Sequence, residues 1–344
     1  MNDDRHDGRS SLEGGRITTD LDGLIGDFSR LKVVVLGDAL LDGYLEGVTT
    51  GVCREAPVPV VTVRQQAYAP GGAGNTASNV AGLGGQVVLL SAIGTDREGD
   101  RLCEALEECG VSTNYVIRSK ERQTVAKYRV RADAEMLVRL DQGTGDPLDA
   151  GTEHALVANL LDVFSTCDAV IISDYGYGIV TPRVIKVLEM LQARARRILV
   201  VDSRRDLTAF RHAGVTAVKP NYAEAIQLLE GLDAAPAANR VETIADRGHH
   251  ILELTRAQSV IVTMDRDGAM VFERGRPVHR TFGYPARQAR AAGAGDTFVS
   301  ALALALAAGA TARAAAELAS AAAAIVVEKE GTVACSVRAL RGSG

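Results

Sequence analysis

Short apolar runs rich in β-branched residues recur along this chain, and each ends in small or polar residues. The first is LKVVVLGD at 31–38, and similar runs occupy residues 86–94, 168–176, 197–204, 215–220 and 258–265. Helical patterns such as 99–110 and 181–197 lie between several of these runs. Buried strands that alternate with helices predict an α/β fold, in which helices cover both faces of a mainly parallel sheet. Ligands of such sheets bind at the carboxyl ends of the strands, so we expect the functional residues there.

Two segments interrupt this alternation. In residues 58–68 and 124–142 the side chains alternate in type with a period near two, and several are charged. This pattern is typical of exposed antiparallel strands. We therefore predict a small β-sheet lid formed by segments at about 43–68 and 118–142. The uncovered edge of such a lid allows a homodimer to form through it.

The two ends of the chain differ in composition. Residues 1–30 are polar and acidic and lack the apolar segment of a secretory signal, so we predict an N-terminal extension whose end can form a short helix. The domain itself is predicted to span 31–340. Its most apolar stretch, 298–327, is rich in alanine and is interrupted by Gly309, Arg313 and Glu317. This interruption predicts two buried helices rather than a membrane span.

Composition argues against several classes of partner. The 344 residues carry a net charge of −5, aromatic residues make up 4%, and tryptophan is absent. Nucleic-acid binding normally uses a basic surface and stacking aromatic rings, so neither nucleic acid nor a membrane is an expected partner. The five cysteines are scattered, and no two form a CxxC pair. We therefore expect no disulfide framework or zinc cluster, and the expected compartment is the reducing cytoplasm.

The segment AAGAGDTF at 291–298 is the strongest candidate for an anion site. A turn of small residues, Gly293, Ala294 and Gly295, leads directly into a helix predicted to begin near Asp296. Glycines let backbone N–H groups approach an anion, and a helix N-terminus adds unpaired donors. A carboxylate at this point can accept a proton from a substrate hydroxyl. The alternative is an ordinary helix cap, because Asp is a common capping residue.

Two further motifs place polar side chains near strand ends. In PGGAGNTASN at 70–79, glycines permit close backbone approach, and Asn75 and Asn79 lie one helical turn apart. Asn amides can bind sugar hydroxyls. In GDALLD, Asp38 and Asp42 follow the first strand and can bind sugar hydroxyls or a cation. The alternatives are a glycine-rich turn with a polar helix face and a loop with an Asp cap.

Asn221 and Glu224 form an N-x-x-E unit after the run at 215–220. An Asn–Glu pair at a helix start can orient water bound to Mg²⁺ near a triphosphate. Helix capping is the alternative, and the unit taken by itself favours that alternative.

The order and spacing of these motifs resemble those of the ribokinase-like (PfkB) carbohydrate kinases. The resemblance extends from Leu31 to Ser336, and the pair PGGAGNTASN and GAGDTF is its most specific part. It implies a three-layer α/β fold with a β-sheet lid, and an enzyme that uses ATP and Mg²⁺ to phosphorylate a sugar. A dinucleotide-dependent oxidoreductase is disfavoured, because GDALLD rather than GxGxxG follows the first strand.

Within that family, the chain is similar to the kinases that phosphorylate O1 of D-glycero-β-D-manno-heptose 7-phosphate. The similarity rests on six segments, which are VVLGDALLDGY, EAPVPVVTV, PGGAGNTASN, the lid strand from KYRV to VRLD at 127–141, ISDYGYG and AAAAIVVEKEGT. The bifunctional relatives carry a nucleotidyltransferase domain with an HxGH motif, which is absent here, so we expect kinase activity alone. The alternatives are a family kinase for another sugar, sugar phosphate or nucleoside, and a non-catalytic sugar or nucleotide sensor.

The resemblance assigns roles to individual residues. Asp296 is the general base, and the backbone from Ala292 through Gly293, Ala294 and Gly295 forms the anion hole. The residues implied at the sugar are Asp42, Gly71, Gly72 and Asn75, with Asp38 nearby. Candidates for binding the 7-phosphate are Lys127, Arg129 and Arg139; the alternative is a solvated, charged strand face. The nucleotide side is assigned Asn221 and Glu224, which hold Mg²⁺ through water, and Arg204, Thr263, Gly268, Arg290, Ala323 and Gly331.

Several positions depart from the family pattern. The family motif is D-x-T-G-A-G-D. In this chain Arg290 stands at the position of its first Asp, and Ala292 stands at the position of its Thr. The missing acid often helps to bind a monovalent cation, so we hypothesise that the Arg290 guanidinium supplies this charge and that the activity is independent of potassium. The alternative is an Arg290 side chain that points to solvent. Tyr177 stands where the heptose kinases have Lys, and this change weakens the assignment of one particular sugar.

Overall fold

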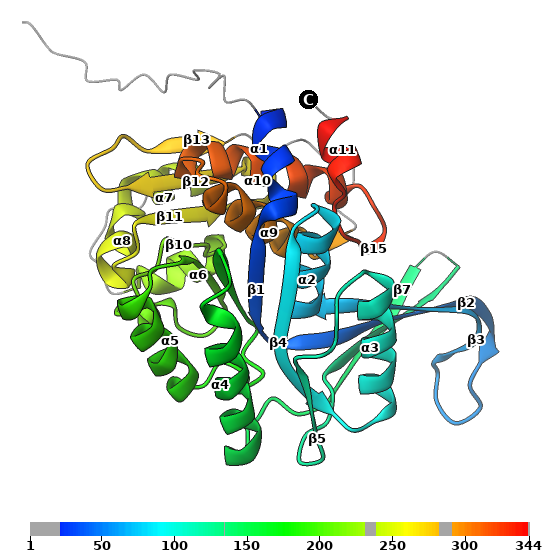
Figure 1. The fold of residues 1–344 in the computed structure, drawn as a ribbon. Coiled ribbons are helices and arrows are strands. Elements are labelled where there is room, and N and C mark those ends of the chain that lie inside the picture. The colour runs from blue at the N-terminus through cyan, green and yellow to red at the C-terminus, as the bar shows by residue number, and fades with distance from the viewer. Residues whose placement is uncertain (1–20, 134, 231–238, 282–290, 343–344) are drawn as a thin grey trace, which may run out of the picture.

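The computed structural model describes residues 21–133, 135–230, 239–281 and 291–342. Its centre is a nine-stranded sheet with the order β13-β12-β11-β10-β9-β8-β1-β4-β5 (Figure 1). The strands from β11 to β5 in this order run parallel, whereas β12 and β13 form an antiparallel edge. The strands are β1 (Lys32–Gly37), β4 (Gln86–Gly94), β5 (Val116–Ser119), β8 (Ala169–Asp174), β9 (Ile198–Ser203), β10 (Ala217–Val218), β11 (Ser259–Thr263), β12 (Ala269–Glu273) and β13 (His279–Thr281).

The central strand β1 shows why the sheet is covered on both faces. Val33 and Val35 belong to one hydrophobic core, while Val34 and Leu36 belong to the other. Side chains alternate across a strand, so a run that is apolar at every position must be buried on both sides. The β-branched runs of the sequence therefore form the middle layer of three.

Helices form the two outer layers (Figure 1). The helices that contribute to the first core are α1 (Leu21–Asp27), α2 (Ala73–Gly82), α3 (Arg97–Glu108), α9 (Ala294–Ala307), α10 (Ala312–Val327) and α11 (Val337–Arg341). Those that contribute to the second core are α4 (Ala150–Phe164), α5 (Pro182–Arg194), α6 (Tyr222–Leu228), α7 (Arg240–Arg247) and α8 (His249–Thr255). Single turns of 3₁₀ helix are η1 (Phe28–Arg30), η2 (Leu207–Phe210) and η3 (Asp265–Asp267).

The alanine-rich stretch forms α9 and α10, as predicted, and both helices are largely buried. In the parts of the chain that the structure describes, no helix combines the length and the apolar character needed to cross a membrane. The end of the predicted extension forms α1 and η1, and Phe28 is fully buried in the first core. This short segment is thus packed onto the domain.

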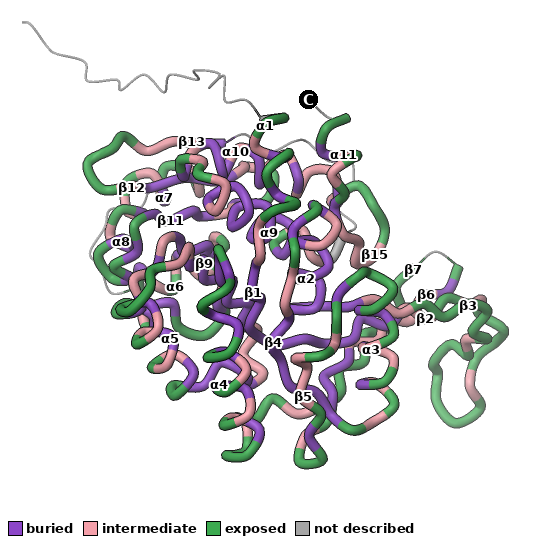
Figure 2. Tube along the Cα trace, in the orientation of Figure 1, coloured by how far each residue is buried: buried purple, intermediate pink, exposed green. Residues whose placement is uncertain are grey.

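A second, four-stranded sheet with the order β3-β2-β6-β7 projects from the main body (Figure 1). Its strands are β2 (Ala39–Val52), β3 (Pro59–Gly72), β6 (Ala126–Ala132) and β7 (Glu135–Gln142). β2 is buried from Ala39 to Asp42 and becomes exposed toward Val52, and β7 is exposed throughout (Figure 2). The sheet is therefore rooted at the carboxyl end of β1 and extends outward as a lid.

The fold class expected from the sequence is confirmed. The structure has a mainly parallel sheet between two helical layers and a separate small sheet. The sequence analysis did not include the antiparallel edge formed by β12 and β13. It also did not include a short parallel pair, β14 (Ala291–Ala292) and β15 (Gly331–Thr332), which joins the segment before α9 to the segment after α10.

Candidate active site

Asp296 lies in the first turn of α9, and its side chain is buried. The helix begins after Gly293, whose φ of 99° is left-handed, and no side chain caps it. The Asp296 Oδ2 accepts a hydrogen bond from Nδ2 of Asn75 at 2.7 Å. Its Oδ1 accepts one from the Tyr175 hydroxyl at 2.6 Å and a longer one from the Thr76 hydroxyl at 3.3 Å. Asp296 therefore does not act as a helix cap, and its carboxylate faces a cluster of polar donors.

The environment of Asp296 prepares it to act as a base near neutral pH. Burial raises its pKa from the ordinary value to about 6, although hydrogen bonds from Tyr175 and Asn75 oppose this rise. Asp202 raises the pKa further, and Lys219 lowers it. A general base is most effective when its pKa lies near the working pH. The carboxylate is ionised at pH 7 and still has an appreciable affinity for a proton.

The backbone of the predicted anion hole lies at the start of α9. Ala294, Gly295 and Asp296 occupy the first turn of α9, where N–H groups have no acceptor within the helix. Gly295 is exposed, whereas a Cβ on Gly293 would overlap the amide nitrogen of Asn75. The N-terminus of α9 therefore has the space and the polarity to bind a phosphoryl group.

Lys219 brings a buried positive charge to the same place, and the sequence analysis did not identify it. Its ammonium lies 3.1 Å from Oδ2 of Asp202, and 3.8 Å from the position that a Cβ on Gly295 would occupy. Both partners of this ion pair are largely buried. A Lys directly after the short strand β10 was the available signal, because charged residues are rarely buried without a partner or a ligand.

The glycine turn before α2 delivers Asn75 to Asp296. Gly72 has a φ of 56°, and a Cβ there would overlap the backbone oxygen of Asp38. Asn79, one turn later, has a structural task, because its Oδ1 accepts hydrogen bonds from Thr297 at 2.8 Å and from the backbone of Cys335 at 2.9 Å. Only the first of the two asparagines on this helix face contacts the carboxylate among the described residues.

Asp42 lies at the root of the lid. Its Oδ1 accepts a hydrogen bond from Arg129 at 2.7 Å, and its Oδ2 accepts one from the hydroxyl of Thr332 at 2.8 Å. Thr332 is also within hydrogen-bonding distance of the Tyr44 hydroxyl, at 2.8 Å. Gly71 packs against this carboxylate so closely that a Cβ there would approach Asp42 Oδ2 to 2.6 Å. The sequence analysis did not identify Thr332 and Tyr44, because they join segments far apart in the chain.

Asp38 binds the backbone of the loop that follows β8. Its carboxylate accepts three backbone hydrogen bonds, from Tyr175 at 2.8 Å, Tyr177 at 3.1 Å and Ile179 at 3.2 Å. Burial, together with the neighbouring Asp174, raises its pKa to about 6. Two of these bonds go to Oδ2 and one goes to Oδ1, so Asp38 holds the loop after β8 and keeps one acceptor position on Oδ1 among the described residues.

The three predicted phosphate ligands of the lid are not equivalent. The Lys127 ammonium donates to the Tyr177 hydroxyl at 2.7 Å and lies 3.6 Å from Asp141. The Lys127 and Arg129 side chains are 14% and 17% exposed, so both are partly shielded from solvent. Arg139 is 55% exposed and binds Asp141 on its own strand. Arg139 therefore has the geometry of the alternative, a solvated strand face.

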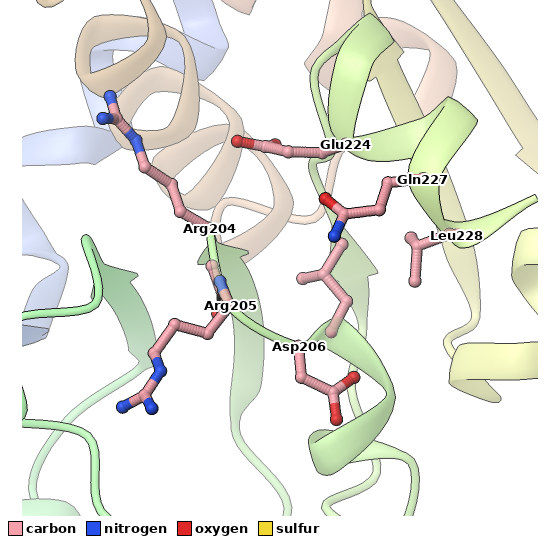
Figure 3. A pocket seen from close by; sticks show the side chains of 8 residues that line it. Arg204, Arg205, Asp206, Glu224, Gln227 and Leu228 are labelled. Atoms are coloured by element: carbon pink, nitrogen blue, oxygen red, sulfur yellow. Dashed lines mark hydrogen bonds between the residues drawn. The ribbon is translucent and has the colours of Figure 1, made fainter. Parts of the chain in front are cut away.

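A cavity of about 220 Å³ opens beyond the carboxyl end of β9 (Figure 3). Glu224 extends from α6 toward the side where Arg204 lies (Figure 3). The side chains of Arg204 and Arg205 point away from each other (Figure 3). The Arg204 guanidinium stacks over the ring of Tyr175 at 4.1 Å from its centroid. The residues that line the cavity are Ser203, Arg204, Arg205, Asp206, Leu207, Glu224, Gln227 and Leu228.

Asn221 and Glu224 form a reciprocal capping box at the start of α6. The Glu224 backbone donates to Asn221 Oδ1 at 2.9 Å, and the Asn221 backbone donates to Glu224 Oε2 at 2.8 Å. This is the helix-capping alternative weighed from the sequence. Burial raises the pKa of Glu224. Capping leaves Glu224 Oε1 at the cavity, which suits Mg²⁺ held mainly by phosphates and water. Within the described ranges, no three His, Cys, Asp or Glu side chains form a ready metal site.

The remaining nucleotide-side residues are spread along the sheet edge. Thr263 forms a β-bridge with Asn221, and Gly268 closes the following turn with a φ of 83°. Ala323 lies within α10. Gly331 lies beside the lid, where a Cβ added to it would stand 3.4 Å from Cζ of Tyr44. Arg290 lies outside the described residues.

Most of this chain is similar in sequence to known proteins. A family model described as pfkB family carbohydrate kinase matches residues 30–339. The bifunctional protein HldE of Desulfatibacillum aliphaticivorans is 33% identical over 314 residues, which are 91% of this chain and 63% of that protein. HldE of Alkalilimnicola ehrlichii is 36% identical over 320 residues, again 91% and 63%. The chain thus spans less than two thirds of the length of these curated relatives.

Solved structures agree on the fold. Phosphofructokinase-2 from Escherichia coli, in complex with substrates and products, superposes with a TM-score of 0.73 at 21% identity, over 91% of this chain and 97% of that one. Ribokinase from Arabidopsis thaliana, in complex with ribose and ATP, gives a TM-score of 0.67 at 19% identity, over 91% and 98%. At these identities the likeness establishes the architecture of the chain.

Proposed function

Because this chain belongs to the pfkB family of carbohydrate kinases, we propose that it transfers the γ-phosphoryl group of ATP to a hydroxyl of a sugar phosphate. The acceptor proposed is O1 of D-glycero-β-D-manno-heptose 7-phosphate. The observation that carries the proposal is a buried Asp296 at the N-terminus of α9, beside backbone donors and the buried Lys219. This arrangement offers a base and an anion site within one turn of helix.

The proposed chemistry follows from these positions. Asp296 accepts the proton of the attacking hydroxyl as that oxygen bonds to the γ-phosphorus and the bond to the β-phosphate oxygen breaks. The N–H groups of Ala294 and Gly295 stabilise the phosphoryl oxygens. Arg204 and Lys219 face the remaining phosphates. Mg²⁺, held by the phosphates, water and Glu224, would neutralise part of their charge. The protein contributes mainly positioning and charge stabilisation.

The sugar is proposed to lie between the glycine turn and the root of the lid. Gly71, Gly72 and Asn75 line one side of this space, and Asp42 lies on β2. Lys127 and Arg129 are the proposed ligands of the 7-phosphate, because a phosphate dianion needs cationic partners with several donors. Their present partners, Tyr177, Asp141 and Asp42, are hydrogen-bonding groups that a phosphate can replace.

Another sugar phosphate is the second candidate substrate. Tyr177 occupies the position of a Lys in the heptose kinases, and its hydroxyl accepts a hydrogen bond from Lys127. This contact changes the set of donors at the proposed phosphate site. A different phosphorylated sugar, positioned by the same lid, would use the same base and anion hole.

The exposed strands of the lid indicate how two copies of the chain can assemble. The lid exposes Val60, Val63, Met136, Val138 and Leu140, and exposed apolar strands favour pairing with a second copy. We therefore propose a homodimer formed through the lid.

We also propose that the protein works in the cytoplasm, which suits free cysteines at all five positions.

The substrate proposal is tested by measuring ADP release with Mg-ATP and a panel of acceptors. The panel contains heptose 7-phosphate, heptose, fructose 6-phosphate, ribose and a nucleoside. Turnover with heptose 7-phosphate at a kcat/KM at least about a hundredfold above that for the others supports the proposed acceptor. A higher kcat/KM for another phosphorylated sugar would identify that sugar as the acceptor instead, and the proposed mechanism would still apply.

A further inference from the structure

Tyr175 is the residue closest to Asp296 that the sequence analysis assigned no task. It follows β8, and its hydroxyl donates to Asp296 Oδ1 at 2.6 Å, a distance typical of a hydroxyl that donates to an ionised carboxylate. Burial and the Asp296 carboxylate raise the pKa of Tyr175 well above its ordinary value. The hydroxyl therefore keeps its proton and acts as a donor throughout the working pH range.

The contacts of Asp296 distribute unevenly over its two oxygens. Each carboxylate oxygen can accept two hydrogen bonds. Oδ1 accepts from Tyr175 and Thr76, whereas Oδ2 accepts from Asn75. Among the described residues, Oδ2 thus keeps a free acceptor position, and Oδ1 does not. Oδ2 is therefore the oxygen of Asp296 that can accept the proton of an incoming hydroxyl.

The backbone and the ring of Tyr175 both have close neighbours. Its backbone N–H donates to Asp38 Oδ2 at 2.8 Å, which fixes the start of the loop. The Arg204 guanidinium covers one region of the ring at 4.1 Å from the centroid. Gly72 lies close enough that a Cβ there would stand 3.4 Å from Tyr175 Cδ2. A ring fixed in this way can fix the carboxylate that its hydroxyl touches.

We propose that Tyr175 is a positioning residue, which holds Asp296 by Oδ1 so that Oδ2 faces the hydroxyl to be phosphorylated. The proposal rests on the phosphoryl transfer proposed above, and it assigns a task that the motifs did not. It also gives a reason for the burial of Asp38, since three backbone hydrogen bonds to its carboxylate hold the loop that carries Tyr175. Arg204, on the phosphate side, keeps the ring in place through its stacking.

Other charged groups also face Asp296 and set the background for a test by pH. Asp202 on β9 raises the pKa of Asp296, and Lys219 after β10 lowers it. α2 contributes the neutral Asn75 and Thr76. Removal of the Tyr175 hydroxyl leaves all of these in place. It removes a hydrogen bond that favours the ionised carboxylate, so the pKa of Asp296 must rise.

The experiment compares the wild-type protein with Tyr175→Phe, which keeps the ring and the Arg204 stack. We expect kcat to fall about tenfold and the acid limb of kcat/KM to move up by about one pH unit, with both KM values within about twofold. Tyr115→Phe is the matched control, because the Tyr115 hydroxyl donates to Asp162 at 2.8 Å on the surface. The control should leave kcat and the acid limb unchanged.

The same hydrogen bond can be tested without turnover by measuring the pH midpoint of the Asp296 carboxyl signal in ¹³C-labelled protein. The signal that is lost in Asp296→Asn is assigned to Asp296. A higher midpoint in Tyr175→Phe supports the hold on Oδ1, and unchanged midpoint, kcat and acid limb overturn the proposal. If Tyr175→Phe does not fold, fluorotyrosine at position 175 replaces it; a more acidic hydroxyl donates more strongly, so the midpoint must fall. A wild-type protein that transfers no phosphoryl group refutes the proposed function, and with it the positioning role, even where the titration still shows the hydrogen bond.

Discussion

Nδ2 of Asn75 lies 2.7 Å from Oδ2 of Asp296, although 221 residues separate them in the chain. Each residue follows a glycine-rich turn at the start of a helix, and α2 packs beside α9 on the same face of the sheet. The two glycine turns are therefore parts of one site. The predictions below follow from this meeting of the two turns and from the charges around it.

The pH dependence of activity should reflect Asp296. Burial raises its pKa to about 6, and the carboxylate must be ionised to accept a proton. Activity is therefore complete well above pH 6 and falls as the pH drops through this value. A profile of kcat/KM between pH 4.5 and pH 8.5 measures the midpoint, and a midpoint near that of an ordinary Asp, at about pH 4, would contradict this assignment.

Gly293→Ala should disturb the site more than its backbone strain alone predicts. Gly293 has a φ of 99°, and a Cβ there would overlap the Asn75 amide that binds Asp296. We expect kcat to fall about a hundredfold, because Asn75 must move. Gly309→Ala is the matched control: its φ is 91°, but nothing lies within 4 Å of the added Cβ. Both variants should lose about 1–2 kcal/mol of unfolding free energy to strain; equal effects on kcat would refute the special role of Gly293.

Lys127 and Arg129 should act on phosphorylated acceptors alone. We expect Lys127→Met and Arg129→Met each to raise KM for a sugar phosphate about tenfold or more, through loss of a charge-assisted hydrogen bond. Arg139→Gln should have a smaller effect, because Arg139 is exposed and binds Asp141. Arg183→Gln, which removes a surface ion pair with Glu153, is the control. An equal rise in KM for the unphosphorylated sugar would show that these cations position the lid instead.

Potassium should have little effect on the rate. By the resemblance to the family, Arg290 occupies the position of an acid that helps to bind a monovalent cation, and a guanidinium cannot coordinate potassium. We expect kcat to change less than about twofold between potassium and tetramethylammonium salts at one ionic strength. Arg290→Asp should create a dependence on potassium. Strong stimulation of the wild-type protein by potassium would refute the hypothesis that the Arg290 guanidinium supplies the charge of the monovalent cation.

Much of the fold was predictable because it depends on local patterns. The apolar run at 31–38 corresponds to β1, and the alanine-rich stretch formed two helices at the expected break. A helix follows Gly293, although it begins at Ala294 and thus before the predicted start near Asp296, because the small residues of GAGD can themselves form its first turn. Periodicity and turn chemistry are properties of neighbouring residues, so one sequence contains them.

The partners of individual carboxylates were not predictable in the same way. Asp38 binds the backbone of Tyr175, 137 residues away, and Asp42 binds Thr332, 290 residues away. Nothing within GDALLD distinguishes these two environments, because only the packing of β8 and β15 against the start of the lid creates them. The Asn221–Glu224 box is the converse: it is local, and the capping alternative was already contained in its spacing.

The central claim is that Asp296 is the base of a phosphoryl transfer, and the most direct test is ADP release by the wild-type protein and by Asp296→Asn. With Mg-ATP and heptose 7-phosphate, we expect the variant to retain ATP binding and the wild-type fold while kcat falls by about 10²–10⁴. Asp162→Asn, at a surface aspartate, should keep the wild-type rate. An Asp296→Asn protein that turns over as fast as the wild type would contradict the claim, as would a wild-type protein that binds ATP and sugar phosphates yet releases no ADP.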